Sequence, residues 1–216
     1  MRNGFLFFIG LFAALTLSWA GVALWPNWQL GLLKPFYDQN DEKAYPQRTP
    51  GIAAEGRMVY DDLGCAACHT QQVRRPDLGS DKARGWGDRQ SVARDYIYDT
   101  HVELGAIRVG PDLANLGARK PAYDRDDLYK LLYAGVGAMP SYKFLFEQRV
   151  ISSNRQPADD AITLYGPLAP PPGTEIVPTH RARRLVEYLL SLSQSYEYPE
   201  ATPVEPAAQG KEGEKK

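Results

Sequence analysis

The strongest constraint on this chain is an uninterrupted apolar run near its N-terminus. From Gly4 to Trp25 there are 22 residues and no charged side chain. A helix of this length rises about 1.5 Å per residue and covers the roughly 30 Å hydrocarbon core of a bilayer. Arg2 precedes the run, and the first charged residue after it is Lys34. The positive-inside rule therefore predicts that segment 1–25 is a single transmembrane anchor and that everything after it is exported.

A cleaved secretory signal is the alternative interpretation of this run, because Ser18-Trp19-Ala20 resembles a processing site. The run is longer than the about 7–15 apolar residues typical of such signals, which favours a retained anchor. Both interpretations place the rest of the chain outside the cytoplasm.

Composition narrows what the exported part contains. The 216 residues are 44% hydrophobic and 24% charged, which is ordinary for a protein with one medium domain and argues against a polytopic membrane protein. The net charge of −1 gives no electrostatic reason to expect nucleic acid as a partner. Two cysteines cannot form a disulfide framework, and the chain lacks the ligands of the common four-ligand zinc fingers.

The chain divides by composition into an anchor and three further segments. Residues 26–50 are punctuated by proline and show no sustained period, so we expect a stalk. Residues 51–198 have the size of one compact domain. Residues 199–216 are rich in proline and charge and are expected to be a disordered tail.

Helical signals dominate the compact domain. A helix is predicted over Ala53–Leu63, a second after Asp124 as its N-cap, and a last one after Thr179 as its N-cap. The last helix carries apolar residues at spacings of three and four, and no comparable β alternation is present. The domain is therefore expected to be mostly α, with a long excursion at 147–178 before its last helix.

Cys65-Ala66-Ala67-Cys68-His69 forms the C-x-x-C-H signature of covalent haem c attachment. Thiols three residues apart reach the two vinyl groups of one porphyrin edge, and the following histidine reaches the iron. A thioredoxin-like redox pair would need a βαβ setting, whereas a helix precedes this motif. The second half of a zinc site is missing. The motif predicts one covalently bound haem c, with Cys65 and Cys68 as its thioether residues and His69 as an iron ligand.

Met139 is the predicted second iron ligand. It lies in a glycine-rich loop before Pro140, and a soft thioether favours reduced iron and raises the potential. Met58 lies on the predicted helix that leads to the haem motif, and it is expected to pack in the core. His101 is the rival ligand and would lower the potential.

Gly110-Pro111-Asp112-Leu113 is the third element of the predicted site. The carbonyl of Pro111, just past a tight turn, can accept the N–H of the proximal imidazole and strengthen its donation to iron. Arg108, just before this turn, is a candidate partner for a haem propionate.

The order of these elements is that of a class I-type cytochrome c, in which the first and last helices cross; Gly56 and Tyr60 would suit that crossing. Six motifs in the middle of the chain indicate one particular family of such cytochromes. They are Gly56-Arg57-Met58-Val59-Tyr60, Gly64–Arg74, Arg84-Gly85-Trp86-Gly87, Asp95–Asp99, Arg108–Gly117 and Met139-Pro140-Ser141-Tyr142. With these motifs the chain resembles the monohaem cytochrome c subunit of cbb(3)-type cytochrome c oxidases.

This resemblance implies a membrane-anchored electron carrier of a bacterial respiratory chain. It would sit in the inner membrane with its haem domain on the periplasmic side and pass electrons to a haem–copper catalytic subunit that reduces oxygen to water. A dihaem cytochrome subunit is a further partner that the resemblance allows. The chain itself shows no constellation for substrate chemistry, so no catalytic residue is assigned to it.

Three alternatives remain open at this stage. The chain could serve another respiratory complex, such as a nitric oxide reductase or a quinol-oxidising assembly. A membrane-tethered gas sensor would need an open or labile iron position. A thiol oxidoreductase would need free thiols and no haem.

Overall fold

The computed structural model describes residues 2–105, 107–151 and 156–201, and these form two compact units. The first unit comprises residues up to 46 together with 93–99, and the second comprises 47–92 and the described residues from 100 onward.

The first unit begins with the predicted anchor. Helix α1 (Arg2–Trp19) continues through a π turn (Ala20–Leu24) into α2 (Trp25–Gly31). Pro26 lies in the first turn of α2, and because proline lacks an N–H it interrupts the regular hydrogen bonding at this point. The helix from Asn3 to Gly31 is long and apolar enough to cross a membrane, and none of its apolar window is buried by protein.

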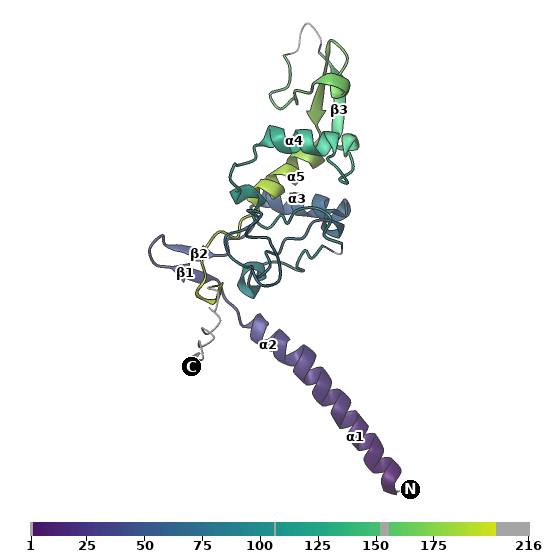
Figure 1. The fold of residues 1–216 in the computed structure, drawn as a ribbon, viewed down its shortest axis with the longest axis vertical. Coiled ribbons are helices and arrows are strands. Elements are labelled where there is room, and N and C mark those ends of the chain that lie inside the picture. The colour runs from purple at the N-terminus through teal and green to yellow at the C-terminus, as the bar shows by residue number, and fades with distance from the viewer. Residues whose placement is uncertain (1, 106, 152–155, 202–216) are drawn as a thin grey trace, which may run out of the picture. The chain divides into compact units, whose positions relative to one another are not determined.

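A small hairpin lies within the segment that we expected to be a stalk. Strands β1 (Phe36–Asp38) and β2 (Lys43–Tyr45) pair antiparallel (Figure 1). The Asp38 carboxylate accepts the N–H of Asn40 at 2.7 Å and so stabilises the turn. Strands of three residues are too short to show periodicity in the sequence.

Among the described residues, three α-helices build the second unit, and all three were predicted. They are α3 (Gly51–Asp62), α4 (Arg125–Ala134) and α5 (His180–Ser191). Asp124 and Thr179 act as the predicted N-caps: Asp124 accepts the N–H of Asp127 at 2.8 Å, and Thr179 Oγ1 accepts that of Ala182 at 3.4 Å.

Helices α3 and α5 cross in close contact, as expected from the sequence (Figure 1). A Cβ at Gly56 would lie 1.9 Å from the carbonyl oxygen of Arg184, so only glycine allows this approach. One turn further along, the rings of Tyr60 and Tyr188 meet edge to face at 5.5 Å. Residues of both crossing helices belong to the apolar core.

The excursion before α5 contains a second sheet. Strands β3 (Phe146–Val150) and β4 (Thr174–Pro178) pair antiparallel over five residues each. The predicted tail begins with a single 3₁₀ turn (Pro199–Ala201) in which Ala201 is buried. The rest of that segment lies outside the described residues.

Candidate functional site

The two cysteines follow α3 directly. The chain leaves the helix through Gly64 and makes one 3₁₀ turn over Cys65–Ala67, and the N–H of His69 donates to the carbonyl of Cys65 at 2.9 Å. Both thiols are free; Cys65 is half-buried and Cys68 is exposed. Burial raises the pKa of the Cys65 thiol to about 11, so it is protonated at neutral pH.

His69 is held by the turn that contains Pro111. Its Nδ1 lies 2.9 Å from the carbonyl oxygen of Pro111, which fixes the proton on Nδ1 and leaves the lone pair on Nε2. The two segments also join through backbone bonds, from Gly110 N–H to the carbonyl of Cys68 at 3.0 Å and from Leu113 N–H to that of Thr70 at 2.8 Å. The structure therefore brings the cysteine motif and the proline turn together.

Asp112 is a residue of this site that the sequence reasoning missed. Its side chain is fully buried, and its two oxygens accept the N–H groups of Gln72 at 2.8 Å and Ala114 at 2.9 Å. Burial raises the pKa of this carboxyl to about 6. Asp112 ties the proline turn to the segment after His69. The position of Asp112 directly after Gly110-Pro111 was the sequence feature that could have indicated its role. The groups that bind its carboxylate cannot be identified from sequence alone.

The Met139 loop packs against the same apolar core as Cys65. Tyr142 N–H donates to the carbonyl of Leu132 at 2.8 Å, which folds the loop back onto α4. Met139 is partly buried against the core cluster that Cys65 also borders. Burial, and after it the thiols of Cys65 and Cys68, raise the pKa of Tyr142.

Met58 does not occupy the core, so that expectation is wrong. The buried residues of α3 are Ala53, Gly56, Val59 and Tyr60. Their spacing places them on one face of the helix, and position 58 lies outside that face. The Met58 side chain is 67% exposed.

His101 and Arg108 engage neighbouring acidic groups. His101 Nε2 lies 2.6 Å from Glu103 Oε1. The Arg108 guanidinium pairs with the buried Asp81 and lies 5.6 Å from the ring centre of Trp86. Arg108 also lines, with Gly110 and other residues, a cavity of about 380 Å³.

The chemistry of these residues fits a haem. Two free thiols, an imidazole with Nε2 unprotonated and a methionine sulfur are the groups that covalent attachment and ligation of a haem require. Apolar side chains in the segment before the proline turn are exposed to solvent, and that of Ile107 is 71% exposed. The N–H of Ile107 donates to the carbonyl of Ala67, so this apolar segment lies beside the cysteine motif. The cavity next to Gly110 includes three arginines, which suit carboxylate groups.

A helical domain with this set of donors is of the kind found in haem-binding, cytochrome-like proteins. The sequence matches the family described as cytochrome C oxidase, mono-heme subunit/FixO, over residues 31–166, and the chain belongs to this family. The resemblance drawn from the motifs is thereby confirmed. A search of curated proteins gives no significant match. The family carries one haem in a cytochrome c oxidase, and the N-terminal apolar helix fits a membrane-anchored subunit.

Proposed function

We propose that this chain is a membrane-anchored monohaem c-type cytochrome that passes electrons to the haem–copper catalytic subunit of a cbb(3)-type oxidase. The observation that carries the proposal is the 2.9 Å contact between His69 Nδ1 and the Pro111 carbonyl, directly after two free thiols, in a chain of the mono-haem family. The chain itself reduces no oxygen; its role is electron transfer.

Cys65 and Cys68 would hold the haem through two thioether bonds, and His69 would ligate the iron through Nε2. When bound, the haem supplies a one-electron iron centre. Pro111 accepts the Nδ1–H of His69, and this contact keeps the ring in one orientation and makes Nε2 a stronger donor. Asp112 supports this function by holding the turn that presents the Pro111 carbonyl.

Met139 would supply the second protein ligand of the iron. Its loop is fixed at both ends, by Tyr142 N–H on the carbonyl of Leu132 and by the Gly135 N–H on that of Leu131 at 2.9 Å. A thioether on such a fixed loop would complete the protein ligands of a haem used for electron transfer rather than for substrate binding. This arrangement argues against a gas sensor.

The anchor holds the protein in the bacterial inner membrane, with the haem domain on the periplasmic side. Support comes from the charge asymmetry around the apolar helix, where Arg2 precedes it and Lys34 follows only after its end. Covalent haem attachment outside the cytoplasm agrees with this orientation.

The ligand assignment is tested with Met139→Ala, with the exposed Met58→Ala as its matched control. Met139→Ala is expected to retain covalent haem on a denaturing gel but to show a lower midpoint potential and an altered spin state. Met58→Ala is expected to leave both unchanged. An unchanged Met139→Ala spectrum together with an altered His101→Ala spectrum would assign the position to His101 instead.

Attachment and partner are tested on the natural assembly. Replacing Cys65 and Cys68 together by alanine is expected to abolish haem staining at the mass of this chain. The detergent-solubilised complex is expected to contain the haem–copper subunit and to consume oxygen. Co-purification with a nitric oxide reductase or a quinol-oxidising complex would contradict the proposed partner.

A further inference from the structure

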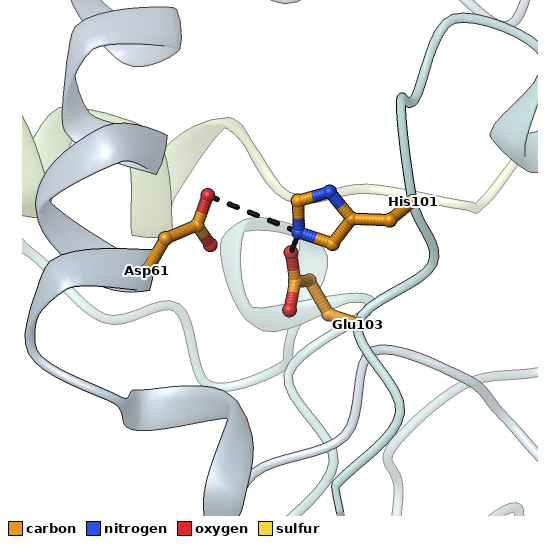
Figure 2. A group of neighbouring side chains, drawn as sticks. All are labelled: Asp61, His101 and Glu103. Carbon is orange, nitrogen blue, oxygen red and sulfur yellow. Dashed lines mark ion pairs between the residues drawn. The ribbon is translucent and has the colours of Figure 1, made fainter.

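A second group of ligating side chains lies apart from the proposed haem ligands. Asp61, in the last turn of α3, and His101 and Glu103, on the loop that follows residue 100, bring their ligand atoms within 4.8 Å of one another. His101 Nε2 lies 2.6 Å from Glu103 Oε1 and 3.9 Å from Asp61 Oδ2. Figure 2 shows both carboxylates directed at this same ring nitrogen.

The other nitrogen of His101 has its own partner. Nδ1 lies 3.2 Å from Thr100 Oγ1. In the tautomer that donates from Nδ1 to this hydroxyl, Nε2 turns its lone pair toward the two carboxylates. In that tautomer a cation between the lone pair and the two carboxyl groups would be bound by all three side chains. Histidines that bind metals are commonly oriented in this way, through a hydrogen bond from the nitrogen that does not bind.

The carboxylate of Glu103 is fixed in place. Its side chain is only 6% exposed, and the Arg57 guanidinium binds Oε1 at 3.4 Å and the carbonyl of His101 at 2.7 Å. Around His101 the cluster contains two acidic side chains, Asp61 and Glu103, and the guanidinium of Arg57. Asp61 and His101, at 36% and 56% exposed, keep the other side open to water.

We propose that Asp61, His101 and Glu103 bind a divalent transition-metal ion, with Zn²⁺ as the probe. Bonds of about 2.0–2.2 Å in tetrahedral geometry separate two ligand atoms by roughly 3.3–3.5 Å. The observed separations of 2.6 and 3.9 Å lie on either side of that value, so sub-ångström side-chain adjustments suffice. Water completes the fourth position. The imidazole ligand selects Zn²⁺ over Mg²⁺ and Ca²⁺, which prefer oxygen ligands.

The site would join two segments next to the haem motif. Asp61 precedes Cys65 by one helical turn, and the carbonyl of Glu103 accepts the N–H of Gln71 at 2.8 Å, two residues after His69. A bound ion would therefore link the residues before the cysteine motif to the loop that binds the residues after it, and so stabilise this segment.

The test uses the full-length, haem-loaded protein in detergent, purified without a polyhistidine tag. Isothermal titration with ZnCl₂ is expected to show one saturable site. His101→Ala and Asp61→Asn are expected to weaken Zn²⁺ binding at least roughly tenfold while haem staining stays intact. His180→Ala, which removes the exposed histidine at the start of α5, is the matched control and is expected to bind as the unaltered protein does. Mg²⁺ is expected to give no comparable heat.

Three results would overturn the proposal. These are the absence of a saturable Zn²⁺ site, equal affinity in the His101→Ala variant, and an equal loss in the His180→Ala control. A zinc-edge absorption spectrum without an imidazole ligand would overturn it as well.

Discussion

Gly110 and the imidazole of His69 are in direct contact. A Cβ at position 110 would lie 2.3 Å from Cε1 of the ring and 2.5 Å from Nδ1. Glycine is therefore required for the proline turn to reach the histidine, and this approach allows the Pro111 carbonyl to meet Nδ1 at 2.9 Å.

We predict that Gly110→Ala displaces either the ring or the turn and weakens the bond from Nδ1 to Pro111. Haem staining is expected to persist, because both cysteines are untouched. The midpoint potential is expected to rise, because a less basic imidazole stabilises oxidised iron less. The free energy of unfolding is expected to fall by about 1–3 kcal/mol. Redox titration and denaturant unfolding measure the two effects.

Gly51→Ala is the control for this variant, since a Cβ there meets nothing within 4 Å. Equal potentials in Gly110→Ala and Gly51→Ala would show that the contact does not tune the iron.

Asp112 gives a prediction about pH. Burial raises the pKa of its carboxyl from 3.8 to about 6, so the folded protein binds this proton more tightly than the unfolded chain does. The stabilising contribution is complete below about pH 4 and is lost as the pH rises to about 6, a change of roughly 3 kcal/mol. Asp112→Asn removes this titration. Its free energy of unfolding is therefore expected to depend less on pH between 4 and 6, as measured by urea unfolding at several pH values.

The Asp112→Asn variant is also expected to be less stable by about 1–3 kcal/mol at pH 7, because an amide NH₂ would face a backbone N–H. Parallel pH curves for the two proteins would contradict the raised pKa.

The sequence predicted the parts of the fold that depend on neighbouring residues. Asp124 and Thr179 cap their helices through residues three positions away, and such bonds can be recognised from spacing. Gly56 was expected at a helix crossing because only a small residue allows backbones to approach, and α5 lies there.

The remaining contacts join residues that are distant in the sequence. The partners of Asp112, the contact of Arg108 with Asp81 and the approach of Asp61 to His101 depend on how loops are placed by the finished core. Met58 was misjudged because its residue type suggests burial, whereas its position on α3 decides exposure.

The helix crossing gives a third prediction. Gly56→Ala would place a Cβ 1.9 Å from the carbonyl oxygen of Arg184 and 2.7 Å from Cβ of Tyr188. Alanine favours a helix over glycine by about 1 kcal/mol, yet the overlap is expected to prevail and to lower the free energy of unfolding by about 3 kcal/mol. Denaturant unfolding measures the change. Met58→Ala, on the exposed face of the same helix, is expected to stay within about 0.5 kcal/mol; similar losses in both variants would refute a specific role for the crossing.

The cap of α4 gives the last prediction, and it connects stability with the proposed iron ligand. Asp124 accepts the N–H of Asp127, and Asp127 in turn accepts that of Asp124 at 3.4 Å, so the pair forms a capping box. Asp124→Ala is expected to lower the free energy of unfolding by about 1 kcal/mol. Asp126→Ala, which removes an exposed pair with Lys130 and leaves the capping box intact, is the matched control and is expected to lower it less. Because the Met139 loop is bonded to the far end of α4, through the carbonyls of Leu131 and Leu132, fraying confined to the first turn is expected to leave the midpoint potential unchanged. A shift in potential in Asp124→Ala alone would show instead that the whole helix moves as a unit and carries the methionine with it.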